Sequence, residues 1–331
     1  MVYHLTGEFI SIMKIKLWGV RGSLASPLST TEYHHKLTRV LQRAVKQNIT
    51  ELAMIENFIR ALPPNLRYVF GGNTTCVSVE SDTGSLNIID FGTGIKPLGD
   101  ELINGPCGKG QGRVNLFLTH NHWDHIQGLP FFRPLYIKGN VLNFYSTCKG
   151  QENILVKQME PPYFPARFED TLSVKTFTEL KGGPGTVIRL EEDLTLEWHN
   201  LKHPSGSTAY KFRQGGKTFI FATDCELTGE ILENSGSDTD FFMNADLLVL
   251  DSQYTLDESF QKIDWGHTSY TMAVNCAIRW KVKNLVLTHH EPSYTDDVLY
   301  SNYIRACMHR KAAGSRLPVI YTAREGMTFR L

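Results

Sequence analysis

The sequence lacks the features that would place it quickly in several common classes. Its six cysteines are scattered and none stands in C-x-x-C spacing, so neither a zinc ribbon nor a disulfide framework is indicated. No stretch approaches the run of about 18 apolar residues that a membrane span needs. The first 30 residues carry four charged side chains instead of a signal-peptide pattern. We therefore expect a soluble, cytoplasmic protein with no membrane partner.

The chain also lacks net charge, because 34 Lys and Arg residues balance 34 Asp and Glu residues. Proteins that bind long nucleic acids usually present a basic face, so this balance disfavours such a partner. A length of 331 residues suggests about two domains, and an apolar content of 41% is ample for a core.

Short runs rich in apolar and β-branched residues predict strands through most of the chain. These runs are 14–20, 74–79, 86–91, 114–119, 141–145, 194–201, 208–213, 217–223, 246–251, 284–288, 318–321 and 327–330. Helical patterns lie near 268–281 and 295–312, and the Pro- and Gly-rich stretch 159–187 is typical of a long surface connection. Because strands recur almost to the last residue, we expect sheets covered by helices in one domain over 13–331, after a leader at 1–12.

Two amphipathic helices are predicted at 30–62, between the first and second strand runs. Ser29 and Glu32 have the spacing of a capping box, and Pro63 and Pro64 stop the second helix. Three roles are open for this helical insert: it packs on the sheets, it covers the site, or it mediates dimerisation.

The strongest chemical signal is the segment 118–125, which follows a strand that reads as buried. It places His120, His122, Asp124 and His125 within six residues. Imidazole and carboxylate groups are good ligands for a borderline divalent ion, and no packing requirement explains three histidines in one loop. The segment therefore predicts a metal site.

Three further candidate ligands share one placement, directly beyond the end of a predicted strand. They are His203, Asp224 and His289. Open α/β sheets collect their sites at the carboxyl ends of strands, so we expect these side chains to meet the first group. The seven ligands suffice for two metal ions that share Asp224.

The motif H-x-H-x-D-H at 120–125 is followed along the chain by His203, Asp224 and His289. This pattern resembles the signature of the metallo-β-lactamase superfamily. This resemblance implies a four-layered αβ/βα sandwich over nearly all of the chain from residue 13. It also implies one metal on His120, His122 and His203, a second on Asp124, His125 and His289, and Asp224 as the bridge. Asp90, in the segment 86–94, matches the family's aspartate that orients metal-binding histidines. Two divalent ions are expected, zinc first, although these ligands would also accept manganese or iron.

Two features of the sequence favour hydrolysis of a phosphodiester, in which the reacting atom is phosphorus. An aspartate at 224, where β-lactamases of the superfamily carry cysteine, favours a hard oxygen bridge between two metals. Gly266, His267 and Thr268 resemble the extra-histidine motif of phosphodiesterase members such as ribonuclease Z. The resemblance implies two-metal hydrolysis in which His267 protonates the leaving group, and the expected catalytic residues are His267 and Asp124.

The substrate is predicted from further resemblance. The segments 18–23 (WGVRGS), 68–76 (YVFGGNTTC) and 287–296 (LTHHEPSYTD) resemble bacterial and phage proteins that include 3′,5′-cyclic nucleotide phosphodiesterases. Arg21 and Asn73 are candidate substrate contacts, although an ion pair and an ordinary turn explain them as well.

We therefore expect hydrolysis of a small phosphodiester such as a cyclic nucleotide. The chain lacks a long basic arm for tRNA, yet a ribonuclease Z-like ribonuclease remains an alternative. A lactonase or thioesterase using the same metals is a further one.

Overall fold

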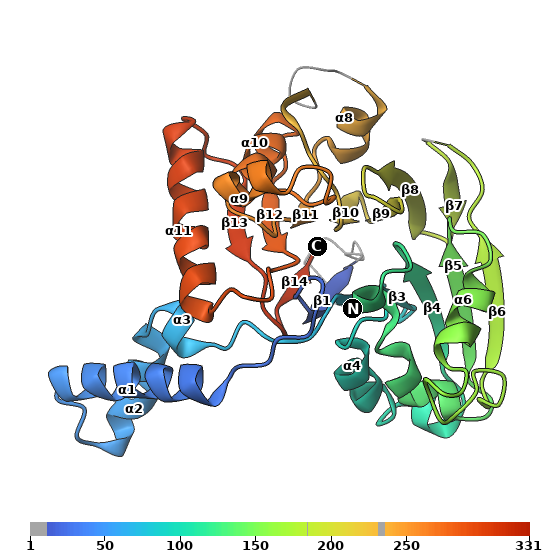
Figure 1. Cartoon of the computed structure of the whole chain (residues 1–331), viewed down its shortest axis with the longest axis horizontal. Coiled ribbons are helices and arrows are strands. Elements are labelled where there is room, and N and C mark those ends of the chain that lie inside the picture. Colours follow the sequence, from blue (N-terminus) through green and yellow to red (C-terminus); the bar gives the residue numbers. More distant parts are fainter. Residues whose placement is uncertain (1–11, 184, 231–235) are drawn as a thin grey trace, which may run out of the picture.

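Two mixed β-sheets lie face to face, and helices cover much of their outer surfaces (Figure 1). The computed structural model describes residues 12–183, 185–230 and 236–331. This arrangement confirms the α/β sandwich expected from the sequence.

The first sheet has the strand order β14-β1-β2-β3-β4-β5-β6. Its strands are β1 (Lys14–Gly19), β2 (Cys76–Glu80), β3 (Leu86–Ile89), β4 (Arg113–Leu118), β5 (Val141–Ser146), β6 (Val174–Glu179) and β14 (Thr328–Arg330). Strands β3 to β6 pair in parallel, and β14, β1, β2 and β3 pair antiparallel.

The second sheet has the order β13-β12-β11-β10-β9-β8-β7. Its strands are β7 (Val187–Arg189), β8 (Thr195–Leu201), β9 (Ser207–Gln214), β10 (Lys217–Ala222), β11 (Leu247–Asp251), β12 (Asn284–Thr288) and β13 (Val319–Thr322). Strands β10 to β13 are parallel, while β9 runs against both β10 and β8. Strands β8, β10, β11 and β12 therefore all end at the same edge of the sheet.

The helices connect these strands or follow them. They are α1 (Thr30–Lys46), α2 (Leu52–Ala61), α3 (Pro64–Arg67), α4 (Ile95–Leu102), α5 (Trp123–Ile126), α6 (Gln151–Gln158), α8 (Ser237–Phe242), α9 (Leu256–Gln261), α10 (Tyr270–Arg279) and α11 (Asp296–Ala312). Short 3-10 helices lie at 106–109, 129–131 and 133–136. Among the helices of the described residues, none is both long and apolar enough to cross a lipid bilayer.

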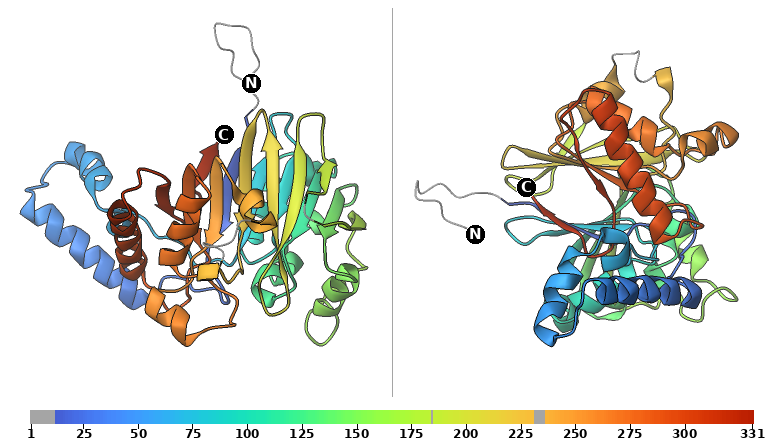
Figure 2. Two further views of the ribbon diagram at one scale, coloured as in Figure 1. Left: turned by 90° about the horizontal axis from the view of Figure 1, so that it is seen from above. Right: turned by 90° about the vertical axis from the view of Figure 1, so that its left-hand side faces the viewer.

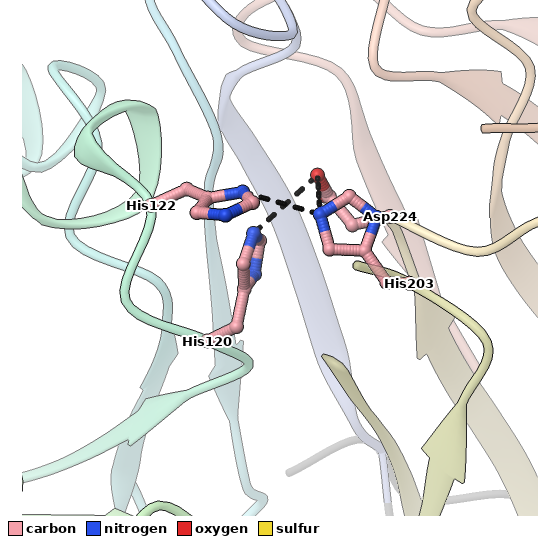
Figure 3. A group of neighbouring side chains, drawn as sticks. All are labelled: His120, His122, His203 and Asp224. Atoms are coloured by element: carbon pink, nitrogen blue, oxygen red, sulfur yellow. Dashed lines mark hydrogen bonds and ion pairs between the residues drawn. The ribbon is translucent and has the colours of Figure 1, made fainter. Parts of the chain in front are cut away.

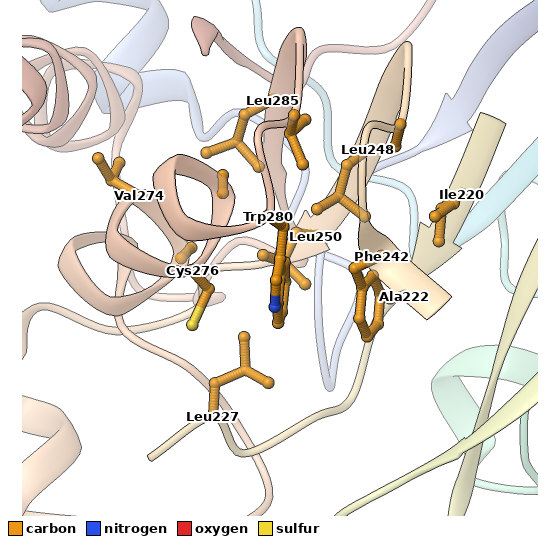
Figure 4. Packing of buried hydrophobic residues seen from close by; sticks show 14 of the residues in the cluster. Ile220, Ala222, Leu227, Phe242, Leu248, Leu250, Val274, Cys276, Trp280 and Leu285 are labelled. Atoms are coloured by element: carbon orange, nitrogen blue, oxygen red, sulfur yellow. The ribbon is translucent and has the colours of Figure 1, made fainter. Parts of the chain in front are cut away.

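Three apolar layers hold the sandwich together. One lies between the sheets, where Phe117 of β4 contacts Tyr210 and Phe212 of β9. A second lies between the first sheet and α4, and a third lies beneath α10. In the third layer the Phe242 and Trp280 rings stack with centroids 4.3 Å apart (Figure 4). Burial of such large side chains is the main source of stability that keeps the strand ends in place.

The predicted helical insert is present as α1 and α2, which interrupt the chain between the antiparallel strands β1 and β2. Ser29 and Glu32 form the predicted capping box. Both helices project from the side of the sandwich that carries α11 (Figures 1 and 2).

The prediction of a long connection over 159–187 was wrong, because this stretch contains β6 and the first residue of β7. Strand β6 extends the first sheet by pairing in parallel with β5, and β7 extends the second sheet by pairing with β8. Both are edge strands with largely exposed side chains, so their apolar patterns are weak. Residues 1–11 of the predicted leader lie outside the described residues, and the domain boundaries stay a prediction.

Candidate metal centre

The seven predicted ligands lie together at the strand ends where the two sheets open. The segment after β4 turns at once into α5, in which the His125 amide donates to the His122 carbonyl over 3.0 Å. This tight turn places four ligands of the first sheet on one side of the centre. His203, Asp224 and His289 follow β8, β10 and β12 of the second sheet.

The first group comprises His120, His122, His203 and Asp224, whose ligand atoms lie within 4.8 Å of one another. Figure 3 shows the three imidazole rings and the carboxylate converging on one point. Asp224 Oδ1 lies 3.6 Å from His120 Nε2 and 3.8 Å from His203 Nε2. His203 Nε2 lies 3.1 Å from His122 Nδ1. Three nitrogens and one oxygen are a donor set suited to a divalent ion such as zinc.

The second group comprises Asp124, His125, Asp224 and His289, again within 4.8 Å. His125 Nε2 lies 3.2 Å from Asp124 Oδ2 and 3.1 Å from Asp224 Oδ2. His289 Nε2 lies 3.3 Å from Asp224 Oδ1. Asp224 belongs to both groups and turns one carboxylate oxygen toward each of His120 and His125, as a bridging ligand would.

Buried polar atoms without hydrogen bonds show that these groups fit metal ions. Among the described residues, Nε2 of His120, His125 and His289 and Oδ2 of Asp224 are buried and make no hydrogen bond. Leaving such atoms unpaired is costly, whereas coordination to a cation satisfies them.

The pKa values of the ligands follow from burial and mutual charge. Burial, with the neighbouring histidines, lowers the pKa of His120 well below its ordinary value, and this favours the neutral imidazole that binds metals. The pKa of Asp224 is also lowered, because the charges of His125 and His289 outweigh the effect of burial. The carboxylate is therefore ionised.

Hydrogen bonds with the surrounding protein orient three of the ligand imidazoles. Asp90 Oδ2 lies 2.8 Å from His125 Nδ1, the Gly266 carbonyl 3.0 Å from His203 Nδ1, and Thr75 Oγ1 3.3 Å from His289 Nδ1. Asp90 also accepts hydrogen bonds from the amide and hydroxyl of Thr119. Such partners hold the ring and its tautomer so that the opposite nitrogen faces the metal.

Three residues of the centre adopt left-handed backbone conformations. Asp90, Asp224 and His289 have φ values of 62°, 58° and 61°. Asp90 and His289 directly follow β3 and β12, and Asp224 follows β10 after one residue. The conformation turns each side chain out of the strand direction. Aspartate and histidine tolerate this region better than most residues, and such strain gathers at functional sites.

Gly266 meets a similar requirement by having no side chain. Its φ is +83°, and a Cβ atom there would lie 2.1 Å from His203 Nδ1. The close approach lets its carbonyl reach this ring, so glycine is needed at this position.

His267 lies beside the second group without belonging to it. Its Nδ1 is 2.9 Å from Asp251 Oδ2, and its ring centroid is 5.0 Å from that of His289. Burial alone would lower its pKa, but the charge of Asp251 outweighs burial and raises the pKa to about 8. Asp251 therefore fixes the ring, so that Nε2 is free to act on a ligand.

Asp251 was missed by the sequence analysis, although it carries the same signal as the predicted ligands. It ends β11, a continuous run of buried residues. Besides His267, it accepts hydrogen bonds from the amides of Asp224 and Thr268. Ser23 was also missed, and its amide donates to Asp124 Oδ2 over 2.8 Å. No side-chain pattern could have revealed a contact made by a backbone amide.

A pocket of about 460 Å³ opens onto the centre. It is lined by Ser23, Asn121, His122, Trp123, Asp124, Asp224 and His267. Trp123 is 81% exposed, although it stands between two ligands on the rigid turn α5. A larger cavity of about 730 Å³ lies elsewhere, beside Trp18 and Lys16, and contains none of the predicted site residues.

Arg21 and Asn73 lie away from this pocket. The buried Arg21 guanidinium donates to the carbonyls of Gly71, Glu291 and Tyr294 over 2.9, 3.1 and 2.8 Å. The Asn73 amide group donates to Glu325 Oε2 over 3.0 Å. Both side chains are thus used in joining loops, and this geometry gives no support to the predicted substrate contacts.

Comparisons with known proteins agree with the fold. The family model of the β-lactamase superfamily domain matches residues 106–290. Ribonuclease Z of Prochlorococcus marinus strain NATL2A is 34% identical over an alignment of length 231 that covers 54% of this chain and 71% of the relative. The tRNase Z TRZ1 of Arabidopsis thaliana is 25% identical over an alignment of length 212 that covers 54% of this chain and 73% of the relative.

Solved structures resemble nearly the whole chain. The metallo-β-lactamase fold protein YhfI of Bacillus subtilis has a TM-score of 0.62 at 15% identity, covering 97% of this chain and 100% of its own. Human tRNase Z, short form, has a TM-score of 0.58 at 16% identity, and the match covers 96% of this chain and 98% of the human chain. At these identities the likeness concerns the fold.

Metal analysis tests the two-ion arrangement. We expect two divalent ions per chain, zinc first, and a lower melting temperature after chelation because metal binding stabilises only the folded state. Asp224→Ala should lose both ions, since both groups use this carboxylate. Elemental analysis after dialysis measures the content. A single ion in the unaltered protein would contradict the arrangement.

The Asp90→Asn variant tests the orienting hydrogen bonds. It should keep two ions but bind them about 10- to 100-fold more weakly, as expected for loss of a carboxylate behind a ligand histidine. Competition with a chromogenic chelator measures the affinity. The exposed Asp170→Asn serves as the control, and equal affinities in the two variants would remove Asp90 from this role.

Replacing Arg21 should chiefly affect stability. Arg21→Met leaves three carbonyls without their donor and should lower the free energy of unfolding by about 2–4 kcal/mol. Urea unfolding measures the change, and the exposed Arg330→Met is the matched control. If the free energy of unfolding is unchanged, Arg21 is not needed for stability and remains a candidate substrate contact.

Proposed function

The chain belongs to the metallo-β-lactamase superfamily, in its ribonuclease Z-like branch, and we propose that it is a metal-dependent phosphodiesterase. One observation carries the proposal: two ligand groups share Asp224, and the His267–Asp251 pair stands at their edge. Such an arrangement suits a reaction in which one substrate needs both positive charge near its anionic oxygens and a proton for its leaving group.

Two divalent ions would supply the charge that activates water and neutralises the oxygens of a phosphodiester. The residues of the chain then have separate tasks. Asp224 would be shared by both ions, Asp124 would bind the second one, and Asp90 orients His125. One ion would have three nitrogens and one oxygen as ligands and the other two nitrogens and two oxygens, with Asp224 counted in both. Such ions would bind a substrate that offers anionic oxygen.

In this proposal His267 protonates the leaving oxygen, and its contact with Asp251 supports the role. Asp251 occupies its Nδ1, so a proton on Nε2 can be donated into the pocket that His267 lines. A leaving alkoxide needs this proton, because its conjugate acid is weak.

The first candidate substrate is RNA. The named relatives are ribonuclease Z proteins, including one that is 34% identical. These relatives argue against the expectation, based on the zero net charge, that a long nucleic acid is a poor substrate for this chain. A local positive centre formed by two ions can attract a phosphate even when the whole chain is neutral.

A small phosphodiester such as a 3′,5′-cyclic nucleotide is the second candidate, and one feature of this chain favours it. The segment 147–173, between β5 and β6, folds back onto the sandwich, with Leu155, Met159 and Phe168 buried. It contains three basic and four acidic side chains, so it is not a basic arm. A small substrate does not need such an arm.

Both candidates carry bases, for which Trp123 is a suitable platform. An exposed indole that lines the pocket can stack on a base next to the scissile phosphate. Packing does not account for this tryptophan, because most of its surface faces solvent.

A substrate panel tests the proposal. Metal-loaded protein is assayed with bis-p-nitrophenyl phosphate, 3′,5′-cyclic nucleotides, a 3′-extended tRNA and an acyl lactone. We expect hydrolysis of the first compound and of either the tRNA or the cyclic nucleotides. If only the lactone is hydrolysed, the protein acts on a carbonyl group and the phosphodiesterase proposal is wrong.

The same panel can be run with Trp123→Ala. For substrates with a base we expect KM to rise about 10-fold, the effect of losing one stacked base, while Trp123→Phe stays near the unaltered protein. An equal change for ribose 3′,5′-cyclic phosphate, which lacks a base, would argue against stacking.

The role of His267 is tested with two leaving groups. His267→Ala should lower kcat by about 10²- to 10⁴-fold for an ester with an alkoxide leaving group. It should affect a p-nitrophenyl ester far less, because nitrophenolate leaves without a proton. Metal content is measured in parallel, and equal losses on both esters would exclude His267 as the acid.

A further inference from the structure

The loop after β1 lies beside the candidate metal centre. The amide of Gly22 donates to the carbonyl of His290 over 3.0 Å, and the amide of His290 donates to the carbonyl of Val20 over 2.9 Å. These two hydrogen bonds fix the loop to the residue that follows the predicted ligand His289. A Cβ atom at Gly22 would lie 2.6 Å from His289 Nε2, so the backbone of the loop passes close to this nitrogen.

Ser23 is the next residue of this loop and lines the pocket of the centre. Its φ is 56°, a left-handed conformation that residues other than glycine seldom adopt. In this conformation its amide donates to Asp124 Oδ2 over 2.8 Å, while the residue as a whole is exposed. The backbone of Ser23 is therefore held by a predicted metal ligand, and its side chain stands at the wall of the pocket.

The side-chain amide of Gln253 determines how the Ser23 hydroxyl is used. Gln253 is 2% exposed, and its Nε2 donates to Glu291 Oε2 over 3.0 Å and to Ser23 Oγ over 3.3 Å. A carboxylate only accepts hydrogen bonds, so Glu291 turns the NH2 end of Gln253 toward itself and toward Ser23. Ser23 Oγ is thus the acceptor in this contact, and its own hydrogen is left for another partner.

The hydrogen of the Ser23 hydroxyl has no acceptor in the part of the chain that the structure describes, where the contact with Gln253 is the only hydrogen bond of Ser23 Oγ. The pocket that Ser23 lines is also lined by Asp124 and Asp224, two of the predicted metal ligands, and by His267, the proposed acid. A phosphate bound at the two ions beside His267 would therefore share this pocket with a free hydroxyl donor.

We propose that the Ser23 hydroxyl donates a hydrogen bond to a non-bridging oxygen of the substrate phosphodiester, and that Gln253 and Glu291 keep it in the donating orientation. This inference rests on the proposed phosphodiesterase function and deepens it. The transition state of phosphoryl transfer spreads charge over the non-bridging oxygens, and a donor already in position stabilises that charge. Ser23 is then a catalytic residue, and Gln253 is a positioning residue.

A contact with the substrate also accounts for serine at a left-handed position. Glycine would adopt a φ of 56° without strain and would keep the amide that donates to Asp124. It has no hydroxyl, however. Strained backbone gathers at functional sites, and at Ser23 the side chain is what the strain retains.

Two variants separate the hydroxyl of Ser23 from its backbone. Ser23→Ala and Ser23→Gly both keep the amide that donates to Asp124, so both should keep two metal ions. Both should lower kcat for bis-p-nitrophenyl phosphate about 10- to 100-fold, as expected for loss of a hydrogen bond to a charged oxygen. Ser26→Ala is the matched control, because the Ser26 hydroxyl donates to the Leu24 carbonyl in the same loop and does not line this pocket. An unchanged kcat in Ser23→Ala would overturn the proposal.

Inorganic phosphate separates this proposal from the proposed function, because its binding needs no turnover. Isothermal titration calorimetry on the metal-loaded protein measures the phosphate Kd, which Ser23→Ala should raise about 10-fold and Ser26→Ala should leave unchanged. If the unaltered protein hydrolyses no phosphodiester, the proposed function is wrong, and weaker phosphate binding in Ser23→Ala would still support the contact. Equal Kd values in the two variants, or a protein that neither binds phosphate nor hydrolyses a phosphodiester, would overturn it.

A sulfur substitution tests whether the contact is direct. In the Rp and Sp diastereomers of a nucleoside p-nitrophenyl phosphorothioate, sulfur replaces one or the other non-bridging oxygen, and sulfur is a weak hydrogen-bond acceptor. Ser23→Ala should lower kcat/KM much less for one diastereomer, the one with sulfur at the position that Ser23 contacts, than for the other. Equal losses for both diastereomers would show that Ser23 acts only through the structure of the loop and would exclude the contact.

A double-mutant cycle tests the role of Gln253. Gln253→Met removes the donor that keeps Ser23 Oγ an acceptor, so Ser23→Ala should lower kcat less in the Gln253→Met background than in the unaltered protein. Circular dichroism and metal content check that each variant is folded and loaded. Independent effects of the two substitutions would overturn the positioning role of Gln253.

Discussion

The metal centre depends on one constraint: nitrogen and oxygen ligand atoms are removed from water and left without hydrogen bonds among the described residues. Unpaired buried polar atoms are destabilising, and two ionised carboxylates in one cluster repel each other as well. Divalent cations would relieve both costs, because they would coordinate these atoms and neutralise Asp124 and Asp224. The surrounding hydrogen bonds, above all the one that His125 donates to Asp90, keep the ligand atoms turned inward.

The two sheets supply the rigid frame that this constraint requires. Parallel strands bring their carboxyl ends to one edge, and apolar layers on both faces of each sheet prevent the strands from shifting. Asp90, Asp224 and His289 then turn their side chains toward the centre through left-handed backbone conformations. The strain is local to the residues that carry the chemistry, and the large buried core tolerates it.

Away from this frame the chain carries two features that lie outside the strands. Helix α1 is attached to α11 by charged groups, and α1 and α2 leave several apolar side chains exposed. The segment 147–173 folds onto the sandwich. The candidate metal centre, in contrast, rests on the strand ends.

Much of this could be predicted from the sequence, because local patterns carry it. Apolar runs predicted most strands, and the spacing of His120, His122, Asp124 and His125 in one turn predicted a metal site. Tertiary structure decided what depends on distant segments. It brought β6 and β7 into the sheets, because edge strands take their pairing from a neighbour. It set Asp251 against His267, and it enclosed Arg21 among carbonyls that lie up to 273 residues away in the chain. Such contacts leave no local pattern, since they exist only after the sheets have packed.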